Sequence, residues 1–286
     1  NRLVGVTVNG DIDVNYATLR LNDVAIDGQV TLTSNYYSRS TLAFEGTQTL
    51  RGHAEIVSST GSYNNTLEME TAGELTLGAD VRVRGVGLSL GASDAFGVTM
   101  QRLINRGVIE ADAGYPPLQV VAELFTNEGV VKASGGTLNL SSASTRNETG
   151  GQFEVTSGTL NVGGPSFTND GELAVSGGTA VVAPSNWTSP GVIAISAGAL
   201  TLGGSYALAD FATLRHTGGT VTITGTLDNT GRTLTLQATP GSWLLNGGVI
   251  QGGTLQIDAG ESLVVGGNNN RLVGVTVNGD IDVNYA

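Results

Sequence analysis

The 286-residue chain has no cysteine, a single lysine (Lys132) and no long hydrophobic run. The lack of cysteine excludes disulfide bonds, thiolate catalysis and cysteine-based metal sites. No apolar stretch approaches the roughly 18 to 20 residues of a membrane-spanning helix, so we expect no membrane insertion of this segment.

Basic residues are also scarce, with 13 against 25 acidic residues, and the formal net charge is −12. No cluster of basic residues stands anywhere in the chain. Nucleic acid is bound by neutralising its phosphates with positive charge, so nucleic acid is excluded as an expected partner.

Glycine is abundant and proline is rare, with 43 glycines and six prolines in the chain. The glycine share is more than twice the average of roughly 7%. Valine, leucine, isoleucine and threonine are also common, so the chain has enough β-branched and aliphatic side chains to form a core. This composition argues against a disordered linker and favours short strands joined by tight turns.

Apolar residues alternate with polar ones from the beginning of the chain. Val6 and Val8 are followed by Asn9-Gly10, and then by Ile12 and Val14. Alternation with a period of two between turn signals predicts short β-strands, and the fold class is therefore all-β. Residues 91–103 and 112–124 are the expected places for longer loops or a helical turn.

A short repeat is visible in the middle of the chain. Similar segments at 104–109, 126–131 and 168–173 each carry an asparagine near their start, and these asparagines are regularly spaced. A repeat of roughly 20 to 22 residues is one turn of a β-solenoid, which must stack on its neighbours to bury its apolar face and satisfy its backbone edges. We therefore predict a single elongated parallel β-helix, with a β-sandwich of hairpins as the alternative architecture.

Stacked turns place equivalent residues in columns. An internal ladder of side-chain amides, bonded along the rod axis, is predicted for Asn105, Asn127, Asn147 and Asn169. Two positions earlier, a column of mainly large apolar side chains is predicted for Leu103, Phe125, Phe167 and Trp187.

A second, much longer repeat involves the two ends of the sequence. Residues 1–17 and 270–286 are identical, so that Asn1 corresponds to Asn270 and Ala17 to Ala286. We interpret residues 1–269 as one complete repeat unit and 270–286 as the start of the next. The expected partners are further copies of the same repeat, in tandem or head to tail, and identical fibres that associate laterally. At the usual strand spacing, one period forms a rod about 55 Å long.

Several segments resemble the large repetitive surface proteins of bacteria, the haemagglutinin-like and autotransporter-like β-solenoids. The likeness rests on WLLNGG at 243–248, on LVGVTVNGD at 272–280, and on the FTNEGVV and FTNDGEL turns. This resemblance implies a right-handed parallel β-helix, an extracellular or cell-surface location, and a role as an adhesin or as a component of a fibre or matrix.

Asp11, Asp13 and Asn15 have the spacing of a calcium-binding loop. An EF-hand loop also needs a glycine and a distal glutamate, and here Ile12 and Val14 occupy the intervening positions. The outward side of a strand explains the pattern better. No metal or cofactor is therefore expected.

Tyr36, Tyr37 and Tyr63 are the best candidates for a ligand contact, because aromatic side chains in polar loops favour sugar or protein binding. The alternative is that these loops fold back on the solenoid. An adhesin whose loops at 34–65 contact a glycan or a protein is thus one alternative function.

Some right-handed β-helices are carbohydrate-active enzymes, which makes catalysis a second alternative. Such enzymes need acids and bases that converge on one site. His53 and His216 stand apart in the sequence. We therefore do not expect this chain to be an enzyme. We predict that it is the structural repeat unit of a long extracellular fibre.

Overall fold

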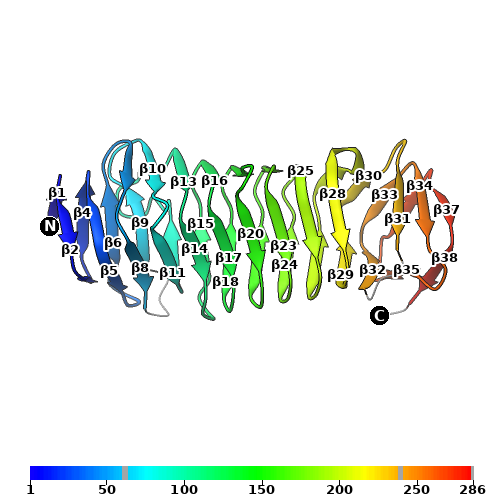
Figure 1. Ribbon diagram of the computed structural model, residues 1–286, viewed down its shortest axis with the longest axis horizontal. Helices are drawn as coiled ribbons and strands as arrows, with labels where there is room; N and C mark the ends of the chain where they lie inside the picture. The colour runs from blue at the N-terminus through cyan, green and yellow to red at the C-terminus, as the bar shows by residue number, and fades with distance from the viewer. Residues whose placement is uncertain (60–63, 238–240, 285–286) are drawn as a thin grey trace.

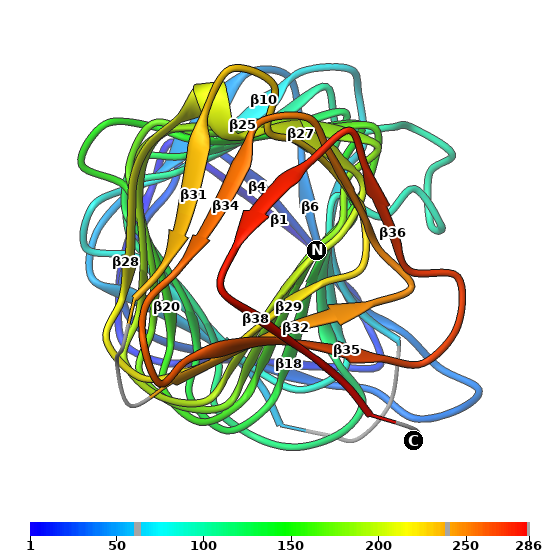
Figure 2. The same cartoon turned by 90° about the vertical axis from the view of Figure 1, so that its right-hand side faces the viewer.

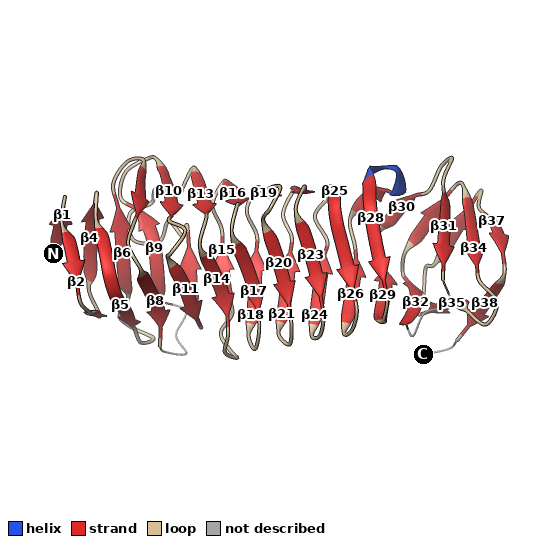
Figure 3. Ribbon diagram, in the orientation of Figure 1, coloured by secondary structure: helices blue, strands red, loops and turns tan. Residues whose placement is uncertain are grey.

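The computed structural model describes residues 1–59, 64–237 and 241–284. The chain winds into a single β-solenoid of about twelve turns, with its two termini at opposite ends of a rod (Figure 1). The described residues contain one helix, a 3-10 helix at Leu208–Asp210, and every other regular element is a strand (Figure 3). The prediction of an all-β solenoid is confirmed.

Each turn contributes one strand to each of three faces. The strands of the first face, in order along the rod, are β1 (Arg2–Val4), β4 (Thr18–Asn22), β6 (Ser40–Phe44), β9 (Asn65–Met69), β12 (Leu88–Leu90), β15 (Leu118–Val120), β18 (Thr137–Leu140), β21 (Thr159–Val162), β24 (Thr179–Val182), β26 (Ala199–Leu202), β29 (Gly219–Ile223), β32 (Gly241–Asn246), β35 (Ser262–Gly266) and β38 (Asp280–Val283).

The second face follows the first within each turn. Its strands are β2 (Thr7–Asn9), the start of β5 (Ala25–Thr33), β7 (Gln48–Leu50), β10 (Glu74–Leu77), β13 (Arg102–Asn105), β16 (Leu124–Asn127), β19 (Ser144–Asn147), β22 (Ser166–Asn169), the start of β25 (Asn186–Ile195), β27 (Ser205–Ala207), β30 (Thr226–Asp228), β33 (Val249–Gln251) and β36 (Arg271–Val273).

The third face completes the turn. Its strands are β3 (Ile12–Asn15), the end of β5, β8 (Ala54–Ser58), β11 (Arg82–Gly85), β14 (Val108–Ala111), β17 (Val130–Ala133), β20 (Gln152–Val155), β23 (Glu172–Val175), the end of β25, β28 (Phe211–His216), β31 (Thr233–Leu236), β34 (Thr254–Ile257) and β37 (Thr276–Asn278).

The register of the parallel ladders gives the length of each turn. Asn127 pairs with Asn147 and Asn147 with Asn169, at sequence separations of 20 and 22. Turns are longer where loops leave the rod, and shorter at its ends, where Leu3 pairs with Leu21. All the ladders among the described strands are parallel, so the hairpin sandwich is ruled out.

The winding is right-handed. In Figure 2 the C-terminal end faces the viewer, and the chain passes from β36 on the right, across the top and down the left side to β38 at the bottom. A counterclockwise path toward the viewer is right-handed, which is the usual hand of parallel crossover connections.

Alternate side chains of each strand point into the rod. In β18, Leu138 and Leu140 are fully buried, and Thr137 and Asn139, which alternate with them, are half-buried. These inward side chains form one continuous hydrophobic core along the whole rod. The period-two pattern of the sequence is therefore the inside-outside alternation of the strands.

Glycine forms a column of its own at one corner. A Cβ atom added to Gly158 would lie 2.2 Å from the carbonyl oxygen of Gly136, and Gly178 and Gly198 meet the carbonyl below them in the same way. Any side chain here would push the turns apart. This close approach explains part of the unusual glycine content.

The longer loop expected at 91–103 is present between β12 and β13, where the Gly97 N–H donates to the Ser93 carbonyl at 2.7 Å and no helix forms. The expected loop at 112–124 is shorter than predicted, because Leu118–Val120 pairs with its neighbours as β15. Leu118 and Val120 alternate with Gln119, a pattern too short to be distinguished from a loop in the sequence.

The stacking predicts that whole turns are dispensable. Deleting residues 128–147 joins Asn127 to Glu148 and removes one turn, while β16 gains β22 as its new neighbour. We expect a folded rod of reduced stability, because the stability of a solenoid is approximately a sum over neighbouring turns. Circular dichroism and thermal unfolding measure this.

The matched control deletes residues 128–137, which removes half a turn and leaves the faces out of phase. We expect this variant to lose cooperative unfolding. Global unfolding of the full-turn variant, or equal behaviour of the two, would contradict a stacked solenoid.

Candidate functional site

The four predicted asparagines form a continuous hydrogen-bonded ladder inside the second face. The Nδ2 of Asn105 donates to Oδ1 of Asn127, Asn127 to Asn147, and Asn147 to Asn169, each at 2.8 Å. All four side chains are fully buried. Each amide also donates to backbone carbonyls of the turn, such as Asn127 to Gly129 at 3.0 Å.

The ladder has definite ends. Asn169 donates to Oγ of Ser189, 2.9 Å, in the following turn. At the other end, Asn105 pairs in register with Leu77, whose side chain is apolar and cannot continue the ladder. The amides thus link five consecutive turns, and a buried polar chain of this kind is stable only when every turn keeps its register.

The predicted apolar column lies beside the ladder. Leu103, Phe125, Thr145, Phe167 and Trp187 are neighbours in register and are all buried. The rings of Phe167 and Trp187 are 6.3 Å apart and tilted by 34°. Thr145 separates Phe125 from these rings, so the aromatic stack itself begins at Phe167.

Other aromatic side chains complete this stack from positions that the spacing of the repeat did not indicate. Phe153, on the third face, stacks on Phe167 with 5.8 Å between centroids. Tyr206 and Phe211 continue the cluster beyond Trp187 at 4.7 and 5.1 Å. Burial raises the pKa of the Tyr206 hydroxyl.

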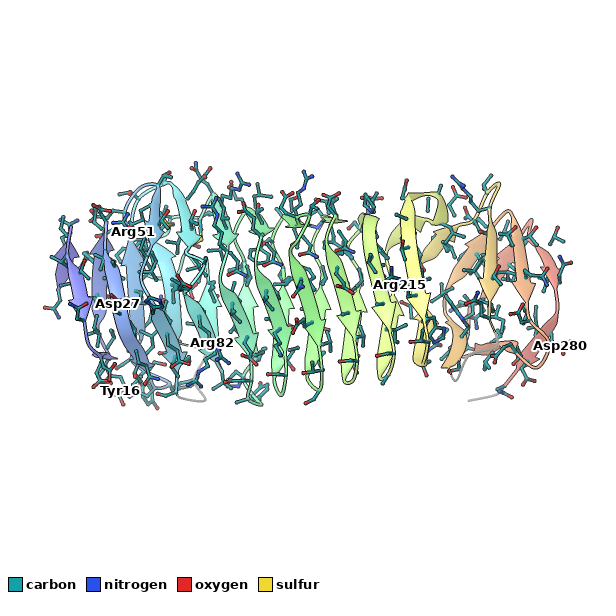
Figure 4. All side chains as sticks on the ribbon, viewed as in Figure 1. Tyr16, Asp27, Arg51, Arg82, Arg215 and Asp280 are labelled. Atoms are coloured by element: carbon teal, nitrogen blue, oxygen red, sulfur yellow. The ribbon has the colours of Figure 1, made fainter. Side chains whose placement is uncertain are left out.

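The first copy of the calcium-like segment lies on the surface of the rod. Asp11, Asp13 and Asn15 are exposed, and Asp11 accepts a hydrogen bond from the backbone of Gln29 at 2.8 Å. Figure 4 shows the copy of Asp11, Asp280, at the far end of the rod. Within the described ranges, no cluster of three or more histidine, cysteine, aspartate or glutamate side chains is arranged to hold a metal.

Tyr36 and Tyr37 project from the loop after β5 and are 85% and 92% exposed. Their rings meet edge to face at 5.2 Å. The loop is held by Asn35, whose Oδ1 accepts from two backbone N–H groups, and by Asn64, whose Nδ2 donates to the Asn35 carbonyl at 2.7 Å. Tyr63 lies outside the described residues.

The loop at 91–101 lies over the outer side of the first face. The N–H of Ala95 donates to the buried carboxylate of Glu68 at 2.7 Å. The guanidinium of Arg20 lies 5.7 Å from the ring centroid of Phe96. This cover explains why β6 and β9 are buried along their whole length.

Charged side chains line the outer surface of the rod, as Arg82 and Arg215 illustrate (Figure 4). On the third face, Arg84 bonds Glu55 at 2.7 Å and pairs with Asp112 at 3.2 Å. The hydrogen bond from Arg84 holds the pKa of Glu55 below its usual range. Exposed pairs of this kind contribute about 0.2 to 1 kcal/mol each.

The two histidines lie in different environments. His53 is exposed and contacts Asp27 through Nδ1 at 3.0 Å, a bond that raises the pKa of His53. His216 lies at the third face, where its Nε2 is 3.1 Å from the Gly219 carbonyl and its ring meets Trp243 edge to face at 5.4 Å.

A cleft opens beside His216, where the third face is interrupted. Among the described strands, β28 pairs only with β25 and β31 only with β34, so no ladder joins β28 to β31 (Figure 1). The cleft has a volume of about 350 Å³ and is lined by Phe211, His216, Arg232 and Trp243 among others. None of its described lining residues carries a carboxylate.

Comparisons with protein-family models, with curated proteins and with solved structures find no match to this chain. No helix of the described residues is long and apolar enough to cross a membrane. The bacterial surface origin therefore stays an expectation from the resemblance of the motifs.

The ladder predicts that replacing asparagine by alanine lowers the free energy of unfolding by an amount that depends on the position. Asn127→Ala removes the amide bonds to Asn105 and Asn147 from a fully buried site, and we expect a loss of about 2 to 3 kcal/mol of unfolding free energy. Urea unfolding followed by the fluorescence of Trp187 and Trp243 measures this loss.

Asn139→Ala is the matched control. Asn139 accepts a 2.8 Å bond from Asn161 in a similar stacked pair, but both side chains are half-buried. We expect a loss below about 1 kcal/mol, because water replaces the missing partner. Equal losses at the two positions would show that the internal ladder has no special role.

Proposed function

We propose that the chain is a structural repeat unit of a long, stiff fibre, in which tandem units stack end to end. The observation that carries this proposal is that residues 1–17 and the described residues of the second copy, 270–284, both form a turn of the solenoid. The first copy pairs with β4 and β5, and the second pairs with β33, β34 and β35.

Each copy leaves one edge of its turn unpaired. β1 pairs only with β4, and β36 only with β33, among the described strands. Unpaired strand edges are templates for further strands. A tandem array satisfies these edges with the same contacts that the rod already contains, so the junction is another turn and not a flexible linker.

The mechanical properties follow from the stacking. Turns spaced by about 4.7 to 4.9 Å give about 60 Å of rod for each period. Bending such a rod opens the ladders of at least one face, and bending that stretches the second face also opens the buried amide ladder. Location outside the cell, attachment to the cell surface and lateral association of fibres belong to this proposal and are supported by the resemblance of the motifs.

A second candidate function is adhesion through the loop that carries Tyr36 and Tyr37. This candidate is favoured by the exposure of both rings on a loop that Asn35 and Asn64 hold in place. Pre-ordered, exposed aromatic side chains are common at binding surfaces, because they lose little entropy on binding.

The rod proposal predicts that length grows in equal steps. Arrays of two and four copies of residues 1–269, each ending in residues 1–17, should appear in negative-stain electron micrographs as straight rods that differ by about 120 Å. The single 286-residue chain provides the reference length. Beads joined by flexible connections, or rods whose length does not follow the number of copies, would contradict the proposal.

The adhesion candidate predicts glycan binding that depends on two rings. The chain should bind members of a glycan array, and the double variant Tyr36→Ser, Tyr37→Ser should lose that binding. Tyr115→Ser is the control, because Tyr115 is 77% exposed on another loop. Absence of glycan binding, or binding that the double variant retains, would remove this candidate.

A further inference from the structure

The two copies of the repeated segment lie on different faces of the rod. β1 belongs to the first face, whereas its copy β36 belongs to the second. In the same way β2 is on the second face and β37 on the third, and β3 is on the third face and β38 on the first. Every strand of the segment has therefore moved forward by one face.

The local structure of the segment is nevertheless the same in both copies. Gly5 and its copy Gly274 have φ angles of 61° and 64°, and Gly10 and Gly279 have 145° and 127°. The same side chains point inward: Leu3 pairs with Leu21, and Leu272 pairs with Ile250. The segment thus keeps its own fold and changes only its position around the axis.

Among the described residues, each copy is bonded to a neighbouring turn on one side only. The first copy is bonded to the turn that follows it, and the second copy to the turn that precedes it. Outside the strand ladders, the first copy bonds the following turn through the carbonyls of Asn1, Val6 and Ala17 and the N–H groups of Gly5, Gly10 and Tyr16.

The second copy bonds the preceding turn through the N–H groups of Arg271, Thr276 and Asn284 and the carbonyl of Val273, which correspond to positions 2, 7, 15 and 4. Among these bonds outside the strand ladders, no position appears in both sets. One turn can therefore make both sets of bonds at once.

The glycine at position 10 fits this double role. Below the second copy, a Cβ atom on Gly279 would lie 2.5 Å from Cβ of Ile257. Above the first copy, a Cβ atom on Gly28 would lie 2.3 Å from the carbonyl oxygen of Gly10. The contact with Ile257 and the positive φ angle restrict position 10 to glycine, and the contact at Gly28 shows that the following turn approaches the backbone of position 10 closely.

The number of turns in one period explains the change of face. Twelve steps along the first face lead from β1 to β35, and β36 is the next strand, on the second face. The period from Asn1 to Asn269 therefore contains twelve turns and one additional face. Since the rod has three faces, the step from one face to the next is one third of a turn.

We propose that consecutive units of the fibre are rotated by one third of a turn about the fibre axis. This inference rests on the proposed tandem array and adds the orientation of its units. A loop such as that of Tyr36 and Tyr37 then points in three directions in three successive units and returns to its first direction after about 180 Å. The partner that fits each end of the rod is a second copy of this chain in this rotated orientation.

Paired cysteines in the 286-residue chain test the rotation directly, because the native chain has no cysteine. Gln256 and Asn278 are neighbours in register on the third face, with a side-chain bond of 3.3 Å. We expect Gln256→Cys with Asn278→Cys to be joined by a short bis-maleimide reagent. Mass spectrometry of the digested protein detects the link.

Two further pairs complete this experiment. Asn139→Cys with Asn161→Cys, stacked within the rod, sets the reference rate of linking. Gln251→Cys with Asn278→Cys is the pair that an unrotated second copy would bring together, because β37 would then lie over β33. Faster linking of Gln251 than of Gln256 to position 278 would overturn the rotation.

An array of three units separates this inference from the proposed function. Each unit carries Tyr37→Cys with a gold label, and cryo-electron microscopy locates the labels. We expect labels about 60 Å apart along the rod, each rotated by one third of a turn from the last. Straight rods with all labels on one side would overturn the rotation and leave the structural role intact. If no rods form, the proposed fibre is wrong, while the cysteine pairs still report the orientation of the second copy.

Discussion

The close parallel stacking of one turn on the next is the constraint on which the rest of this structure depends. Backbone hydrogen bonds fix the spacing of the turns at about 4.8 Å, so equivalent residues of successive turns must be compatible at that distance. Glycine is required where backbones meet, as at Gly158 and Gly178. Amides are favoured where a polar column is buried, because an amide both donates and accepts along the axis. Composition, repeat and fold thus have one common cause.

Most of the fold could be predicted because stacking leaves a periodic signal. The asparagines from Asn105 to Asn169 recur at the length of one turn, and their ladder follows from that spacing. Phe153 could not be placed in the same way, since it reaches the aromatic stack from another face. The interruption between β28 and β31 also leaves no periodic signal, because Leu214 and Leu234 are spaced like residues of paired turns. Contacts between faces depend on the shape of the corners, which the period does not encode.

The rod is not uniform along its length. In the middle, short turns of nearly equal length carry the amide ladder, with few loops on the outside. Toward the N-terminus, the loop at 91–101 covers the first face and buries Glu68. Toward the C-terminus, the third face opens at the cleft beside Trp243. Long, regular ladders suit the transmission of load, and the loops and the cleft are the features through which one segment of the rod differs from another.

The direction in which each unit faces is set by the fraction of a turn that is left after the whole turns of one period are counted. The total length of the period does not set this direction. Loops such as 91–101 lengthen individual turns without changing the number of faces, so insertions there leave the rotation unchanged. Adding or removing one strand with its corner would change the rotation by a third of a turn. The step from Leu3 on the first face to Val8 on the second spans only a few positions, so a small change in length is enough. A fibre of this kind therefore combines a tolerance for variable loops with a strict count of strands.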